Sequence, residues 1–212
     1  MRCIRVAMKA VSVTILLVAG CATIPTQAPI GAVQADLAFP PQGATWVMRR
    51  DMNTFTVVSE GEGMYHGKPV YRFSFGNETS VIDKESGNKI ADLRDGKELT
   101  TISPHSGTML WPLFVGKSWT ARSAYEDHVN RRTWNNVVTY WTVEAYEDVA
   151  VPAGTFKAFR IQSSPGENDG TIKTLWYAPE MKIAVKSIFE RSSTHYLGAG
   201  RFVTELMEYH AP

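Results

Sequence analysis

Cysteine is nearly absent from this sequence, because the 212 residues contain only Cys3 and Cys21. Cys3 lies within an N-terminal leader of the kind that is removed on export, which leaves Cys21 as the single cysteine of the mature chain. A disulfide within the chain, a cysteine-based metal site and a thiol nucleophile are therefore excluded. Stability must come from a hydrophobic core, and the length suffices for one domain of ordinary size.

An excess of positive or negative charge is also lacking. The 22 Lys and Arg residues face 21 Asp and Glu residues, and removal of a leader with three basic residues leaves 19 basic side chains and a net charge of −2. The pairs Arg49-Arg50 and Arg131-Arg132 are short and typical of solvated strand ends. Nucleic acid is therefore excluded as a partner, and so is a second membrane contact through a polybasic patch.

Long hydrophobic runs are missing as well. The run from Ala10 to Gly20 has eleven residues, whereas a permanent membrane helix needs roughly 20. Arg2, Arg5 and Lys9 precede this run, so residues 1–20 have the charged and apolar regions of a bacterial signal peptide.

The leader ends in Leu17-Val18-Ala19-Gly20-Cys21, which resembles the lipobox of bacterial lipoproteins. This resemblance implies that the thiol of Cys21 carries diacylglycerol through a thioether, and that acyl chains such as palmitate then fix the protein to a membrane. A buried core cysteine or an ordinary secretory signal is the alternative. The polar, proline-rich sequence after Cys21 gives that residue no core to join and favours lipidation.

Residues 21–44 are predicted to be the lipidated cysteine and a flexible tether, since they are rich in Pro, Ala, Gln and Gly and carry one charge, Asp36. As a flexible coil, this segment spans about 26 Å. Ala22 follows the cysteine, where Asp would indicate retention in the inner membrane. In a Gram-negative bacterium we therefore expect the periplasmic face of the outer membrane.

Residues 45–212 form a single β-rich domain in this interpretation. Tyr71, Phe73 and Phe75 alternate with polar residues, and so do Trp141, Val143 and Ala145. No window of eleven residues shows a helical stripe, and the best short helical candidate is Leu113 to Trp119.

Turn signals recur every 8 to 15 residues along this domain and imply antiparallel neighbours. The strongest are Glu85 to Asn88, Asp95-Gly96, Val151 to Gly154 and Pro179. We expect an all-β fold, a strongly curved antiparallel sheet or an open barrel of about ten strands, with a sandwich as the nearest alternative.

Three motifs resemble a group of exported bacterial proteins and lipoproteins that share a domain of unknown function, sometimes labelled TapB-like. These are Trp111 to Trp119, Val151 to Phe156 and Trp176 to Glu180. The resemblance covers roughly residues 110–209, and its members more often carry Gly where this chain has Lys182. It implies an all-β domain distantly similar to the carriers that escort lipoproteins between bacterial membranes. It supplies no catalytic residue, and Trp119 and Trp176 are expected to be core anchors.

No catalytic, metal or cofactor site is predicted. The five histidines (His66, His105, His128, His195 and His210) have no metal-ligand spacing. Ser103 to Gly107 places serine hydroxyls near an imidazole, but a surface turn is favoured over a nucleophile and its base. Glu60 with Glu62, and Glu126 with Asp127, are interpreted as solvated edges. Asn168-Asp169-Gly170 lacks the regular oxygen ligands of a calcium loop.

The aromatic content, with 6 Trp, 9 Phe and 8 Tyr, is the feature most able to conceal a function. A curved sheet can hold an apolar ligand, although side chains that fill the interior are the preferred explanation. The leading hypothesis is a non-enzymatic envelope lipoprotein that binds an apolar ligand or an envelope protein, with the ligand-binding residues undetermined. An assembly factor that acts through an exposed strand edge is the alternative, and an envelope hydrolase is third.

Overall fold

The alternation of apolar and polar side chains produces an all-β protein, as predicted. The structure, a computed structural model, describes residues 27–164 and 170–212, and within these ranges it contains strands and turns but no helix. That part of the chain accordingly has no helix long and apolar enough to cross a membrane. The predicted signal peptide, Cys21 and the beginning of the predicted tether lie outside the described residues.

The strands of the described residues follow one another along the chain with short connections. They are β1 (Gln34–Ala35), β2 (Thr45–Arg50), β3 (Asn53–Tyr65), β4 (Lys68–Phe75), β5 (Glu78–Asp83), β6 (Lys89–Arg94), β7 (Lys97–Ser103), β8 (Leu113–Phe114), β9 (Ser118–Asp127), β10 (Arg132–Val151), β11 (Gly154–Ser164), β12 (Thr171–Ala178), β13 (Ile183–Arg191) and β14 (Gly200–His210).

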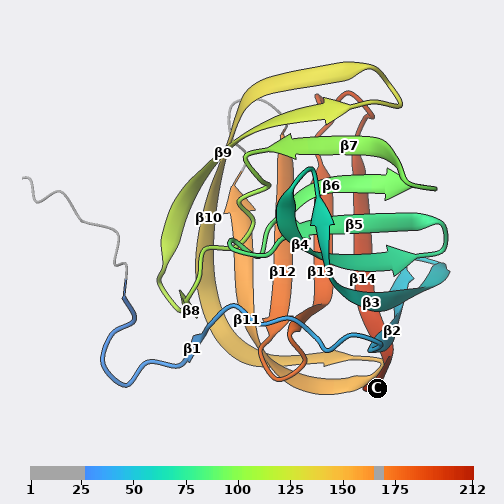
Figure 1. The fold of residues 1–212 in the computed structure, drawn as a ribbon. Helices are drawn as coiled ribbons and strands as arrows, with labels where there is room; N and C mark the ends of the chain where they lie inside the picture. Colours follow the sequence, from blue (N-terminus) through green and yellow to red (C-terminus); the bar gives the residue numbers. More distant parts are fainter. Residues whose placement is uncertain (1–26, 165–169) are drawn as a thin grey trace, which may run out of the picture.

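Twelve of these strands form one closed antiparallel barrel, and β1 pairs with β8 in a separate two-stranded sheet. Neighbours in the chain pair as hairpins, and two pairings between distant segments complete the ring: β14 with β2, and β7 with β9. In Figure 1, β5, β6 and β7 cross in front of β12, β13 and β14. The interior lies between these two crossing layers.

The prediction of about ten strands in an open barrel or curved sheet is wrong in number and in closure. Three turns, at Asp51-Met52, His66-Gly67 and Gly76-Asn77, divide residues 45–83 into four strands. Asp51 and His66 adopt φ values of 54° and 47°, which sequence rarely signals for such residues. Closure depends on the pairing of β14 with β2, whose partners are far apart in the chain and which local patterns do not encode.

The predicted turns are confirmed. Asp95 and Gly96 both have positive φ, as a type I′ hairpin requires, and Val151 pairs with Gly154 across the β10–β11 turn. Lys182 follows Pro179 with φ 59°, which explains why glycine is favoured at this place in the proteins that the sequence resembles. The helical candidate at Leu113 to Trp119 is wrong, because this stretch holds β8, a turn at Gly116 and the start of β9.

The strand register defines the inner face of the barrel, because directly paired residues point to the same side of a sheet. Trp46 pairs with Val57, and Trp119 pairs with Trp141. Around the ring, these positions belong to one face. One buried cluster on it combines barrel side chains with Ala35 of β1, Leu113 of β8 and residues of the β7–β9 connection; its members are Ala35, Leu113, Trp119, Ala121, Trp141, Val143, Phe159, Ile161 and Tyr177, with Met109 and Trp111 packed against them.

The segment before β2 packs on the barrel, which corrects the predicted tether. The ring of Phe39 stacks on Tyr71 at 4.4 Å, and the Tyr71 hydroxyl donates a hydrogen bond to the carbonyl of Pro40. Ala35 and Ala44 are buried. Residues 35–44 therefore belong to the folded domain, because their apolar side chains find partners that their proline-rich composition did not reveal.

Candidate functional site

A cavity of about 620 Å³ lies inside the barrel between β2 and β7. Its volume falls within the range of roughly 300–1,000 Å³ that is usual for small-molecule sites. One wall is apolar and largely aromatic, and it consists of Trp46, Phe55, Val57, Phe73, Phe75, Ile82 and Leu99. Most of these residues alternate along β2, β3 and β4, so the period-2 pattern of the strands places them on the inner face.

The rest of the cavity lining is polar and charged, and it begins on β5, where Glu78 and Ser80 pair with Phe75 and Phe73. Arg94 donates two hydrogen bonds to Oε1 of Glu78, at 2.6 and 3.1 Å. The ammonium of Lys89 binds Asp92 at 3.0 Å, and the Ser80 hydroxyl donates to the same carboxylate. Arg50 of β2 adds a further cation beside Phe55. The cavity therefore offers an apolar surface and a charged surface to one occupant.

A second cavity of about 320 Å³ adjoins the first, since Thr100 lines both. Tyr125, Trp134 and Tyr196 provide its aromatic lining, and Asp127 its carboxylate. Hydrogen bonds from Asn130 are the main cause that lowers the pKa of Asp127, and burial raises the pKa of Tyr196. The ionised carboxylate is thus satisfied by its own turn.

The interior is therefore only partly filled. Solid packing, the preferred expectation, is correct around Trp119 and Trp141, where the β7–β9 connection occupies the inner face. It is wrong for the part between β2 and β7, because the connections there have only two to five residues, too few to fill that space.

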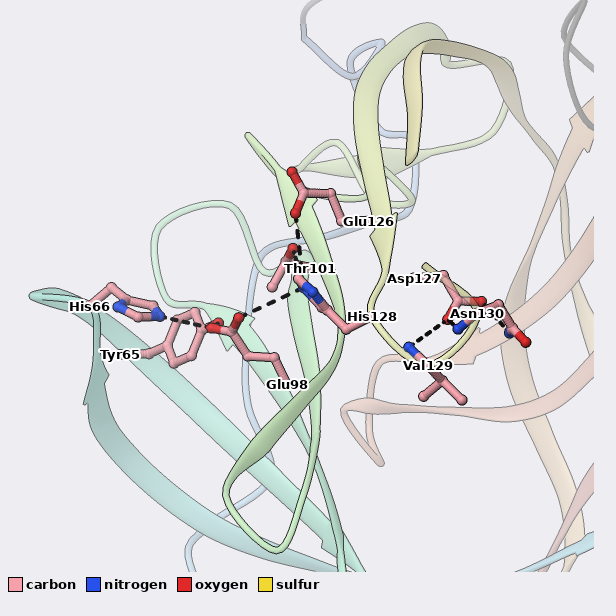
Figure 2. A network of polar contacts seen from close by, with 9 residues as sticks. All are labelled: Tyr65, His66, Glu98, Thr101, Glu126, Asp127, His128, Val129 and Asn130. Carbon is pink, nitrogen blue, oxygen red and sulfur yellow. Dashed lines mark hydrogen bonds and ion pairs between the residues drawn. The ribbon is translucent and has the colours of Figure 1, made fainter. Parts of the chain in front are cut away.

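A polar network on the outer face of the barrel is the other concentration of functional groups (Figure 2). Glu98 of β7 accepts a hydrogen bond from the Tyr65 hydroxyl and contacts His66 Nε2 at 2.9 Å, and its second oxygen lies 3.7 Å from His128 Nε2. The bond from Tyr65 is the main cause that lowers the pKa of Glu98, and burial is the main cause that raises the pKa of Tyr65. The network joins the end of the β3–β4 hairpin to β7 and β9.

This network does not have the geometry of a catalytic triad. His128 Nε2 approaches the Thr101 hydroxyl at 3.1 Å, Glu98 at 3.7 Å and Glu126 at 4.0 Å, all through the same ring nitrogen. A catalytic histidine instead contacts the nucleophile with one nitrogen and the orienting acid with the other. The hydroxyl, imidazole and carboxylate converge here, but as a structural contact between strands.

The paired carboxylates have separate environments. Glu60 and Glu62 form surface ion pairs, with Arg72 at 3.7 Å and Lys84 at 2.6 Å, as expected for solvated edges. Glu126 and Asp127 point to opposite faces, so only Glu126 is on the outside. Among residues 27–164 and 170–212, no group of three or more His, Cys, Asp or Glu side chains could hold a metal ion.

The predicted surface turn at Ser103 to Gly107 is wrong at its second half. Gly107 is buried, its carbonyl accepts a hydrogen bond from Trp119 Nε1 at 2.8 Å, and the His105 carbonyl accepts one from Ser123. The imidazole of His105 accepts from the backbone N–H of Gly107. This histidine stabilises a loop. Cys21 and residues 168–169 lie outside the described ranges.

Sequence reasoning missed the charged lining of the cavity. The short pair Arg49-Arg50 predicts two solvated side chains, and Arg49 does lie on the outer face, where it binds Glu205 at 3.1 Å. Arg50 is also exposed at the strand end, as predicted, but it lines the cavity as well. The signal that could have found it is the parity of β2, since Arg50 shares its face with Trp46 and Met48.

Comparisons with known proteins address the fold. No protein-family model matches the chain, and no curated protein matches it. The fold is similar to the crystal structure of the hypothetical lipoprotein YmcC from Escherichia coli K12, with 15% identity, a TM-score of 0.46, and coverage of 82% of this chain and 88% of that one. It is also similar to an exported protein with a YmcC-like fold from Bacteroides fragilis, with 12% identity, a TM-score of 0.38, and coverage of 83% and 99%.

Proposed function

We propose that this protein is a non-enzymatic lipoprotein of the bacterial envelope whose barrel cavity binds a small, largely apolar ligand. The cavity of about 620 Å³ between β2 and β7 carries this proposal. Its aromatic wall removes apolar ligand surface from water, which is worth about 0.8 kcal/mol for each buried methylene group. Affinity should therefore increase with the length of an alkyl chain until the cavity is full.

The lipid anchor is the second part of the proposal. Cys21 attaches the chain to a membrane, in a Gram-negative bacterium the periplasmic face of the outer membrane. The barrel then stands near the bilayer surface, where apolar ligands are concentrated.

The test combines detection of a natural ligand with a binding assay. The exported Cys21→Ser protein is purified without detergent, its organic extract is analysed by mass spectrometry, and uptake of a fluorescent fatty acid is titrated. Val57→Phe fills the cavity and should weaken uptake about tenfold, which corresponds to ~1.4 kcal/mol of binding free energy. Val58→Phe, on the opposite face of β3, is the matched control and should bind normally. Absence of both extracted lipid and probe uptake would refute ligand binding.

The alternative functions find less support. Each barrel strand in the described residues has two paired neighbours, so none of these strands is a free edge along its whole length. An assembly factor would have to act through loops or through the short unpaired stretches, such as the start of β11. The hydrolase hypothesis would rest on His128, which uses one ring nitrogen for the contacts described above.

A further inference from the structure

Two adjacent arginines on β2 have different environments. Arg49 lies on the outer face and binds Glu205, while Arg50, the exposed last residue of β2, lines the larger cavity. Alternation along the strand is the reason, since successive side chains lie on opposite faces of a sheet. The pair therefore places the same charge on the two faces of the sheet, one residue apart, and Arg50 lies where the cavity meets solvent.

The other charged groups of the cavity neutralise each other. Arg94 is paired with Glu78, and Lys89 with Asp92. The lining contains the cations Arg50, Lys89 and Arg94 against these two carboxylates, so one positive charge is in excess.

Arg50 carries this excess charge. Its Nε donates to the Thr204 hydroxyl at 3.2 Å, and its guanidinium lies 5.6 Å from the centre of the Phe55 ring. Within the described ranges, it forms no ion pair with a carboxylate. The contacts to Thr204 and Phe55 hold the side chain beside the aromatic wall, and they leave the terminal guanidinium nitrogens available to a ligand.

We infer that the ligand of this cavity is an anionic amphiphile, whose apolar chain lies on the aromatic wall and whose carboxylate or phosphate group binds Arg50. The inference rests on the proposed function and specifies its ligand class. A guanidinium presents parallel N–H donors that match both kinds of oxyanion, and such charge-assisted bonds are stronger than neutral ones. The apolar wall and the charged group are close enough for one ligand to reach both, because Phe55 belongs to the wall and lies against the guanidinium.

The experiment compares head groups on a constant alkyl chain. Exported Cys21→Ser protein is titrated with a fatty acid, an alkyl phosphate, a fatty alcohol and an alkyltrimethylammonium ion of equal chain length. We expect the acid and the phosphate to bind at least about tenfold more tightly than the alcohol, and the cation to bind most weakly. The acid and phosphate arms distinguish the two sources of the anionic group.

Arg50→Gln should weaken binding of the two anions at least about tenfold more than binding of the alcohol. Arg49→Gln is the matched control on the outer face and should keep the full preference. Circular dichroism and the urea unfolding midpoint show whether the Arg50→Gln protein is folded. Equal binding of acid and alcohol, or equal effects of the two arginine substitutions, would overturn the inference while leaving an apolar site in place. If none of the four compounds binds, the proposed function itself fails.

Discussion

At the scale of single residues, Glu98 shows how one carboxylate can stabilise the contact between distant strands. It accepts a hydrogen bond from the Tyr65 hydroxyl and contacts His66 at the end of the β3–β4 hairpin. Its second oxygen faces His128, the residue after β9. Glu126 approaches the same imidazole of His128 from 4.0 Å. The side chain of Glu98 is about one-third exposed, so water weakens these contacts without abolishing them.

The lowered pKa of Glu98 predicts a pH-dependent contribution to stability. Since its pKa is lower in the folded state than the ordinary value of 4.5, the contribution is complete above about pH 4.5 and is lost as the pH falls through the folded-state pKa. Glu98→Gln should cost about 1 kcal/mol near neutral pH, less than is usual for bonds to charged groups because of the exposure. Urea unfolding of both proteins at several pH values measures the difference.

The control for this prediction is Glu126→Gln, whose side chain is 56% exposed and lies at the margin of the network. It should change stability by less than Glu98→Gln at neutral pH. A stability difference between the wild-type and Glu98→Gln proteins that persists undiminished in acid would contradict the assignment.

At the scale of elements, the connection from β7 to β9 determines which part of the barrel is full. Residues 104–117 lie against the inner face, where Trp119 Nε1 binds the Gly107 carbonyl and the buried Lys117 ammonium donates to the Pro112 carbonyl at 2.8 Å. Burial lowers the pKa of Lys117. The pattern at Ser103 to Gly107 predicts a surface turn, but the Gly107 and His105 carbonyls find partners inside.

Gly107 tests this close packing. It has φ 61°, and a Cβ there would overlap that of Ala121 on β9. Gly107→Ala should therefore destabilise the protein by ~2 kcal/mol or more, because left-handed strain and overpacking act together. Thermal and denaturant unfolding measure the loss.

The strain and the overlap can be separated with a second glycine. Gly67 has φ 75°, and a methyl group at that position would meet open space, since no atom lies within 4 Å of it. Gly67→Ala should cost only the strain, about 1 kcal/mol. Adding Ala121→Gly to Gly107→Ala should recover part of the loss, and no recovery would show that the two positions do not meet.

At this scale, the alternation of apolar and polar residues does not predict the face of every side chain. Trp141 and Val143 share the inner face, as predicted, but a bulge between Val143 and Ala145 shifts the register and moves Ala145 to the other face. Trp119 is a core anchor, whereas Trp176 is only half-buried and binds Glu147. The residue types of this segment predict that it forms a strand. They do not predict the bulge, because a bulge depends on what the strand packs against.

At the scale of the whole molecule, the barrel and the predicted lipid anchor are separate parts of the chain. The folded domain includes residues 35–44, which shortens the chain between Cys21 and the barrel compared with a tether that ends at residue 44. Ligand exchange with a membrane would then take place close to the bilayer.

Cys21→Ser tests the anchor. Without the thiol, no thioether to diacylglycerol can form, so the protein should leave the membrane fraction and lose the mass of the lipid. Fractionation of cells and mass spectrometry of the intact protein measure both changes. Cys3→Ser, within the predicted leader, is the control and should leave membrane attachment intact. Membrane association that is unaffected by Cys21→Ser would defeat the lipoprotein proposal.

The sequence by itself determined the all-β class, several turns and the motif at Cys21, because alternation, turn chemistry and the lipobox are properties of neighbouring residues. Barrel closure, the packing of residues 35–44 and the inward loop at Gly107 were decided only by the tertiary structure. So was the charged side of the cavity, where Arg50 meets Phe55 of β3 and Thr204 of β14. These features depend on contacts between segments far apart in the chain, and no local pattern specifies which distant partner a strand, a loop or an arginine will meet.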